Sequence, residues 1–132
     1  MSQENVEIMR TAYEAIGRRD RETLDAILRE RLAPDFEFEA ALTGATYRGL
    51  DGFWELLDDI EDTVSYRPEV QEAIDLGDHV LVVLRMSGRG SRSGVSVAQQ
   101  GAVLVTFDGS TLVSGRSFAS KAEAFEAVGL RE

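Results

Sequence analysis

"HVLVVLRMSGRGSRSGVSVAQQGAVLVTF", residues 79–107, is the most strand-like segment of this sequence. Its two halves are rich in aliphatic and β-branched residues, and the turn "RGSRSG", residues 89–94, separates them. This pattern predicts two long antiparallel strands joined by a hairpin. Side chains alternate between the faces of a strand, so Gln99, Val103 and Val105 share one face of the second strand.

Two further strand-like segments flank this hairpin. "YRPEVQEAIDLGD", residues 66–78, precedes it and ends in a Gly-Asp turn. "TLVSGRSFA", residues 111–119, follows the hairpin signal at Asp108 and Gly109. Strands that follow one another through short turns pair antiparallel, so these segments predict four consecutive strands in one sheet.

An upstream segment, "DFEFEA" at residues 35–40, alternates apolar and acidic residues and predicts another strand. Its apolar residues fall on one face and its acids on the other, so Glu37 and Glu39 should point away from the protein core. A shift of one residue in register would reverse this arrangement. "LTGATYRG", residues 42–49, then predicts a turn and a short strand.

Apolar residues at helical spacing predict helices that begin the chain and flank the first strands. One stripe runs from Val6 to Ile16, and a second helix begins after the N-cap candidate Asp20 and ends before Pro34. A third helix covers about residues 50–62, and a capping box at Ser120 predicts a short C-terminal helix. Helices grouped beside an antiparallel sheet indicate an α+β fold.

Composition limits the classes of function. The 132 residues suit a single domain, residues 1–132, and 43% of them are hydrophobic. The net charge of −10 disfavours a nucleic-acid partner. The chain has no cysteine and no long apolar run, so we expect a cytoplasmic protein that has no membrane partner. A single histidine without cysteine excludes an ordinary zinc site, and we expect neither metal nor cofactor.

The order of these elements resembles the nuclear-transport-factor-two-like superfamily, which includes the ketosteroid isomerases, and within it the SnoaL-like group of polyketide cyclase relatives. The resemblance implies a cone-shaped, curved antiparallel sheet around a hydrophobic pocket, packed on three helices, and a homodimer formed through the outer sheet face. The stretches that carry it cover nearly the whole chain in order: "ENVEIMRTAYEAIGRRD", "APDFEFE", "TYRGLDGF", "DLGDHVLVV", "FDGSTLVSGRSF" and "AEAFEAVGL".

The same resemblance allows a comparison with the steroid isomerases, which use a carboxylate base and two oxyanion donors. The base position falls on Ala40, and the two donor positions fall on Ala12 and Val103. None of these side chains can do acid–base chemistry, so we expect no steroid isomerase activity. His79 lies at the start of a strand. An exposed histidine is the simpler interpretation there, and a general acid or base is the alternative.

Two arginines and one glutamine are the remaining polar candidates. Arg85 and Arg116 lie in mid-strand and could supply the arginine of the Asp-Arg-Asp arrangement that epoxide hydrolases of the superfamily use. No aspartate accompanies them in the two long strands. The alternative role for each arginine is an ion pair or a dimer contact. Gln99 shares a face with Val103 and can orient a carbonyl or hydroxyl group. The aromatics Tyr47 and Trp54 complete the predicted pocket, which comprises Phe36, Phe38, Tyr47, Trp54, Arg85, Gln99, Val103 and Arg116.

Two functions of different class follow. The first is a cofactor-independent cyclase, isomerase or hydratase acting on a small apolar or polyketide-like molecule. The second is a non-catalytic module for small-molecule binding or dimerisation, which the missing base favours. The sequence leaves the catalytic residues unassigned and does not decide between the two.

Overall fold

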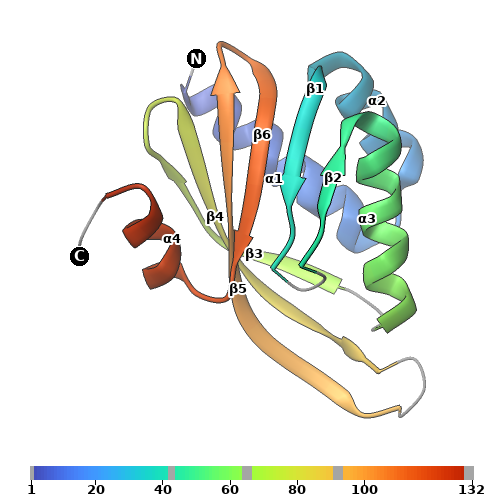
Figure 1. The fold of residues 1–132 in the computed structure, drawn as a ribbon. Helices are drawn as coiled ribbons and strands as arrows, with labels where there is room; N and C mark the ends of the chain where they lie inside the picture. Colours follow the sequence, from blue (N-terminus) through green and yellow to red (C-terminus); the bar gives the residue numbers. More distant parts are fainter. Residues whose placement is uncertain (1, 42–43, 64–66, 91–93, 130–132) are drawn as a thin grey trace.

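The computed structural model describes residues 2–41, 44–63, 67–90 and 94–129. Within them the chain forms four helices and one six-stranded sheet (Figure 1). The elements in chain order are α1 (Ser2–Arg18), α2 (Arg21–Arg31), β1 (Leu32–Glu39), β2 (Thr46–Arg48), α3 (Gly49–Thr63), β3 (Arg67–Asp75), β4 (His79–Arg89), β5 (Ser96–Asp108), β6 (Thr111–Phe118) and α4 (Lys121–Ala127).

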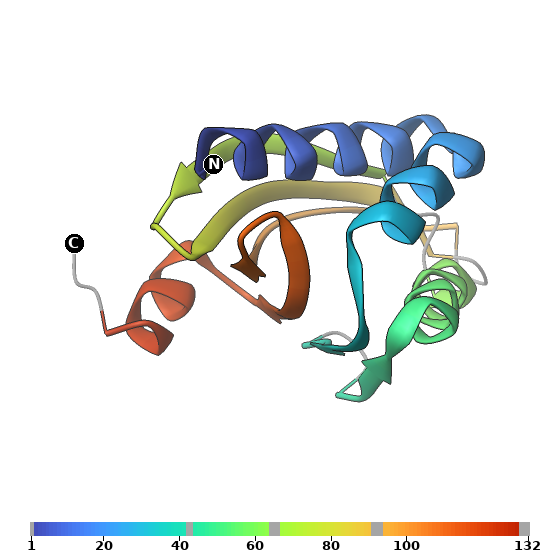
Figure 2. The ribbon, with the colours of Figure 1, turned by 90° about the horizontal axis from the view of Figure 1, so that it is seen from above.

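The strands lie in the order β2-β1-β6-β5-β4-β3. The predicted meander of four antiparallel strands is confirmed, because β3, β4, β5 and β6 pair in sequence. However, β1 pairs with β6 in parallel, so the sheet is mixed rather than wholly antiparallel as predicted. Parallel neighbours need a long connection, and here α3 and four strands lie between them along the chain. Figure 2 shows that the sheet is strongly curved.

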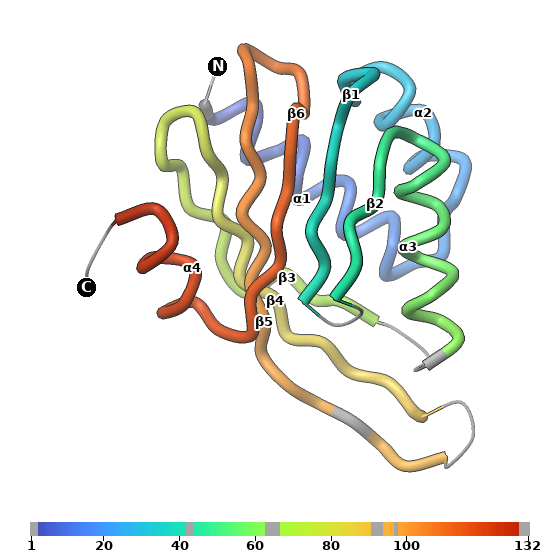
Figure 3. Tube along the Cα trace, viewed as in Figure 1, coloured from blue at the N-terminus to red at the C-terminus, as the bar shows by residue number. Residues whose placement is uncertain are grey.

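The β4–β5 hairpin extends beyond the rest of the sheet (Figure 3). Its register runs without a break from His79 opposite Thr106 to Arg89 opposite Ser96. β6 pairs with β5 only as far as Ala102, so the first half of β5 has no β6 neighbour in the described part of the sheet. The middle of the turn predicted at residues 89–94, residues 91–93, lies outside the described ranges.

Three helices cover the inner face of the sheet, which we define by Val82, Leu84, Val103 and Val105. α1 runs along β3 and β4 (Figure 2), while α3 packs beside β1 and β2. The side chains of α1 and α3 join this face in one apolar core. A smaller apolar cluster forms where α1, α2 and α3 meet, and it holds Trp54.

The fourth helix lies on the opposite, outer face of the sheet. α4 buries Ala124 against Leu81, Val83 and Ala102, and Leu104 packs against the same cluster. Ala102 and Leu104 belong to the outer sheet face, through which the family resemblance implies a homodimer. The C-terminal helix of the same chain packs over them, and the dimer itself stays a prediction.

The predicted helix caps are present. The Asp20 side chain accepts a hydrogen bond from the Thr23 amide at 3.1 Å, and Ser120 accepts one from the Glu123 amide at 3.2 Å. α2 ends at Arg31, three residues before Pro34, because β1 already begins at Leu32. β1 therefore begins three residues before the strand that the alternation predicted at residues 35–40.

Candidate functional site

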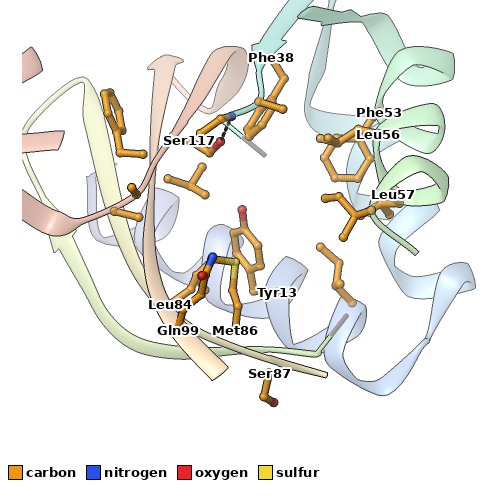
Figure 4. A pocket seen from close by; sticks show the side chains of 18 of the residues that line it. Tyr13, Phe38, Phe53, Leu56, Leu57, Leu84, Met86, Ser87, Gln99 and Ser117 are labelled. Atoms are coloured by element: carbon orange, nitrogen blue, oxygen red, sulfur yellow. Dashed lines mark hydrogen bonds between the residues drawn. The ribbon is translucent and has the colours of Figure 1, made fainter. Parts of the chain in front are cut away.

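A cavity of about 470 Å³ lies between α1, α3 and the inner face of the sheet (Figure 4). Most of its wall is apolar. The described residues that line it are Tyr13, Ile16, Phe38, Ala40, Ala41, Phe53, Leu56, Leu57, Ile60, Leu84, Met86, Ser87, Gly90, Gln99, Ala102, Val103, Ser117, Phe118 and Ala119.

Alternation along the strands explains which side chains reach this cavity. β1 places Phe38 in the wall and β5 places Gln99 and Val103 there, while the acids of β1 point to solvent. Glu37 pairs with Arg48 at 3.2 Å, and Glu39 pairs with an arginine of β6 at 3.3 Å. The prediction that these acids lie outside the pocket is therefore confirmed.

Two glycines make room for side chains in the cavity wall. A β-carbon at Gly115 would stand 2.6 Å from Cδ2 of the Phe38 ring, and one at Gly101 would stand 2.4 Å from Cε of Met86. Real β-carbons do not approach other atoms so closely. The missing side chains on β5 and β6 therefore let Phe38 and Met86 lie against the sheet instead of filling the cavity.

Polar groups in the wall are few. Among the described lining residues they are Tyr13, Ser87, Gln99 and Ser117, and none of the lining side chains is acidic, basic or an imidazole. Figure 4 shows the Tyr13 hydroxyl directed into the cavity and the Ser87 hydroxyl directed away from it. The Ser117 hydroxyl accepts a hydrogen bond from the Ala41 amide at 2.7 Å.

The exposed members of the wall mark where the cavity meets solvent. Ala41, Gln99 and Ala119 are exposed, whereas Tyr13 and Val103 are buried. Ala41 follows the end of β1 and Ala119 follows the end of β6. Gln99 lies on the part of β5 that extends past β6. The mouth therefore lies at the base of the β4–β5 hairpin, with Gln99 at its rim.

Three of the eight predicted pocket residues, Phe38, Gln99 and Val103, line the cavity. Phe36 is buried in the structure but is not part of the wall. Tyr47 is also buried outside the wall, and its hydroxyl donates to Asp59 Oδ2 at 2.8 Å. A ligand-binding role stays a prediction for the three that line the cavity.

The predicted pocket residues Trp54, Arg85 and Arg116 also lie away from the cavity. Trp54 packs in the three-helix cluster, with the Arg21 guanidinium 4.6 Å from its ring centroid. Arg85 is exposed on the outer face, because it alternates with the inward-facing Leu84. Arg116 is exposed too, where it pairs with Glu39 and lies 4.9 Å from the Phe118 ring centroid.

The other polar candidates fall outside the cavity as well. His79 bonds through Nδ1 to the Thr106 hydroxyl at 2.9 Å, and neither residue lines the cavity. In the described residues, no group of three or more histidine or acidic side chains is placed to hold a metal ion, the acidic run of α3 included. No helix among them has the length and apolar composition needed to cross a membrane.

Tyr13 is one of the lining residues that sequence reasoning missed. It belongs to the apolar stripe of α1 with Met9 and Ile16, which we took only as the core face of a helix. In a fold whose cavity lies inside the core, part of such a stripe lines the cavity. The signal was therefore present, since tyrosine is the one residue of that stripe with a polar group at its tip.

Comparison with known proteins places the chain in a family. One similar solved structure is an NTF2-like protein from Burkholderia xenovorans LB400, with 27% identity, 89% of this chain and 90% of that chain covered, and a TM-score of 0.72. A second is a candidate SnoaL-like polyketide cyclase from Jannaschia sp. CCS1, with 17% identity, coverage of 98% and 94%, and a TM-score of 0.76. A third is a protein with a ketosteroid isomerase-like fold from Catenulispora acidiphila in complex with trimethylamine, with 20% identity, coverage of 95% and 94%, and a TM-score of 0.73. No curated protein matches the chain. The family model of the SnoaL-like domain matches residues 9–114, and the chain therefore belongs to the SnoaL-like family.

Proposed function

We propose that this protein binds a small, mostly apolar organic molecule in the cavity between α1, α3 and the sheet. The observation that carries the proposal is the cavity itself, whose volume of about 470 Å³ is enclosed chiefly by aliphatic and aromatic side chains. Small-molecule sites typically enclose ~300–1,000 Å³ and combine apolar walls with a few placed polar groups. The specific activity of the protein is not established.

Binding without acid–base catalysis is the function that the cavity wall supports best. A general base must reach the reacting atom within hydrogen-bond distance, and carboxylates or imidazoles most often serve in that role. The steroid-isomerase positions hold Ala12, Ala40 and Val103, which are all buried. The described wall residues contain no carboxylate or imidazole that could replace them.

A cofactor-independent cyclase, isomerase or hydratase is the second candidate. The Jannaschia neighbour, named as a candidate polyketide cyclase, favours it. Such an enzyme would work by folding its substrate in the cavity, into which the Tyr13 hydroxyl is directed. Its rate would then depend on pH and fall in Tyr13→Phe, whereas a binding module would show no turnover.

The test of binding is a screen of one- to three-ring hydrocarbons, ketones and phenols by melting temperature and saturation-transfer NMR. A ligand that binds only the folded state raises the melting temperature by mass action. Trp54 emission is an indirect readout, since Trp54 lies outside the wall and its ring centroid is 6.2 Å from that of the lining residue Phe53. If no compound in the screen binds, the proposal fails.

A pair of matched variants shows whether a hit occupies this cavity. Ala41→Trp places an indole at the mouth, where Ala41 is exposed and part of the wall. Ala122→Trp places the same side chain on the exposed surface of α4, away from the cavity. Ala41→Trp should weaken binding and Ala122→Trp should not; equal effects would mean that the compound binds elsewhere.

The partners and location of the protein stay predictions. We propose a homodimer through the outer sheet face as its assembly. The part of that face that α4 leaves exposed includes Arg85, Ala98 and Gln100. A cytoplasmic location remains a prediction from the sequence alone.

A further inference from the structure

We propose that the free edge of β5 binds an extended, acidic segment of a partner protein as an additional strand. The backbone of Ser96, Ala98 and Gln100 forms the hydrogen bonds of this contact, and the neighbouring Arg85 and Arg89 select the acidic partner. This surface lies outside the cavity, so the inference goes beyond the proposed function and does not depend on it.

The first half of β5 has a free edge in the described part of the sheet. β6 pairs with β5 only as far as Ala102, and the chain then leaves the sheet to form α4 on the outer face (Figure 1). The segment from Ser96 to Gly101 therefore has β4 as its one strand neighbour among the described residues. Ser96, Ala98 and Gln100 are exposed.

The direction of the backbone hydrogen bonds shows which residues face this edge. The Gly90 amide donates to the Val95 carbonyl at 2.9 Å, and the Phe107 amide donates to the Asp78 carbonyl at 2.8 Å. The register of β4 with β5 has no break between these two bonds, so the odd-numbered residues of β5 bond to β4. Backbone bonds alternate between the two sides of a strand. The even-numbered residues from 96 to 100 therefore direct their N–H and C=O groups toward the free edge.

The edge lacks the features that usually prevent strand addition. Natural sheet edges are protected by charged side chains, prolines or bulges. The segment at residues 96–101 reads "SVAQQG", which contains no charged residue and no proline, and its pairing with β4 has no bulge. Another extended chain can therefore pair with it through main-chain hydrogen bonds.

The charge beside the edge selects the occupant. Residues 79–107 contain three arginines and no acid, although the whole chain has a net charge of −10. Arg85 and Arg89 are exposed on β4, where they lie opposite Gln100 and Ser96 of β5. Within the described ranges neither arginine forms an ion pair. Two cations without a counter-charge favour an acidic segment.

An added strand lies within reach of these arginines. Neighbouring strands are ~4.8 Å apart, so the added strand stands about 10 Å from β4. Arginine and glutamate side chains together span this distance, and the small side chains of Ser96 and Ala98 leave room between them. A second copy fits less well, because pairing two β5 edges brings two arginine-bearing hairpins side by side.

The experiment uses two capped heptapeptides, Thr-Glu-Val-Glu-Val-Glu-Thr and its counterpart with lysine in place of each glutamate. Each is titrated into the full chain at low ionic strength, and binding is followed by amide NMR and hydrogen exchange. With the glutamate peptide, we expect the amides of Ser96, Ala98 and Gln100 to shift and to gain protection from exchange. We expect the lysine peptide to bind at least about fivefold more weakly, since one exposed ion pair can contribute that factor.

Matched variants locate the site. Ala98→Pro removes an N–H group that faces the edge and leaves the bonds to β4 in place, while Ala122→Pro makes the same change in the first turn of α4, where proline is tolerated. Arg85→Gln and Arg89→Gln each remove a charge beside the edge, and Arg29→Gln removes one from the exposed surface of α2. The first variant and the two β4 arginine variants should lower the affinity for the glutamate peptide severalfold, and the two controls should not.

The outcomes decide both the edge and its occupant. The proposal is wrong if the glutamate peptide does not bind, if the lysine peptide binds as tightly, or if the shifted amides lie away from β5. Protection of the edge amides that grows with protein concentration, without peptide, would show that a second copy occupies the edge instead. Equal effects of Arg89→Gln and Arg29→Gln would overturn the role of the arginines, and this comparison remains decisive if Ala98→Pro does not fold.

Discussion

The Phe38 ring lies so close to Gly115 that a β-carbon at position 115 would stand 2.6 Å from Cδ2 of the ring. The two residues are opposite each other in the parallel pairing of β1 with β6. Gly115 thus fixes how far the Phe38 ring can withdraw from the cavity, and the width of the cavity depends on an absent side chain.

Gly115→Ala should push the Phe38 ring into the cavity. Overpacking of a buried site typically costs ~1–3 kcal/mol of stability. Ligand binding should weaken too, because the displaced ring occupies ligand volume. Chemical denaturation and a ligand titration measure the two effects. In a Phe38→Leu background the same substitution should cost much less; an equal cost would mean that the clash is not with Phe38.

Asn5 should be one of the most sensitive polar positions of α1. Its side chain is 3% exposed, and Nδ2 donates to the Gly109 carbonyl at 2.8 Å, which fastens the helix to the β5–β6 turn. Asn5→Ala removes this hydrogen bond between a buried side chain and the turn and should cost ~0.5–1.5 kcal/mol. The exposed neighbour Gln3→Ala should have little effect on urea unfolding, and similar losses from both would contradict this role.

Stability at low pH should depend on the cap of α2. Hydrogen bonds from the Thr23 hydroxyl and amide lower the pKa of the Asp20 carboxyl below its ordinary value of 3.8. A carboxyl with a lowered pKa in the folded state stabilises it above the unfolded pKa, and this stability is lost as the pH falls through the folded pKa.

The test compares the wild type with Asp20→Asn, which keeps a good N-cap but does not titrate. Between about pH 6 and about pH 3, the melting temperature of the wild type should fall more than that of Asp20→Asn. Circular dichroism at both pH values gives the comparison. Parallel decreases in the two proteins would show that Asp20 titration is not involved.

A turnover assay on a Δ5-ketosteroid should show no appreciable isomerisation. The positions of the base and the two oxyanion donors hold Ala40, Ala12 and Val103, and one such donor alone is typically worth ~10²-fold or more in rate. Efficient conversion would mean that other residues do this chemistry. Heat-inactivated protein is the control for the spontaneous reaction.

Light scattering at micromolar concentration should give the mass of a dimer. The exposed outer-face residue Ala98 lies beyond the region that α4 covers, on a strand that has no charged residue from Ser96 to Phe107. Ala98→Glu should shift the equilibrium toward the monomer through desolvation of the new charge. Ala122→Glu on α4 is the matched control. A monomer mass for the wild type would refute the proposal.

The sequence predicted the site best where one strand pattern decides the answer. Alternation placed Phe38 on one face of its strand and Glu37 and Glu39 on the other, and it placed Gln99 on the same face as Val103, which the family resemblance assigned to the pocket. That pattern needs only the period of two and one known face. The antiparallel meander followed equally well from short turns.

The errors came from relationships between distant elements. Trp54 belongs to a helix that packs against both the sheet and two other helices, and helical spacing does not tell which face meets the cavity. Similarly, the seven residues of α4 could cover either face of the sheet. The parallel pairing of β1 with β6 depends on the path of the whole chain, so no local sequence pattern predicts it.

The location of the mouth has a consequence for how this protein can change over time. Ala41, Gln99 and Ala119 border the cavity yet are exposed, so substitutions there alter what a ligand meets without disturbing the buried core. Exposed positions usually tolerate substitution within ~0.5 kcal/mol. The lining of the cavity mouth can therefore diversify among descendants of this chain at little risk to folding.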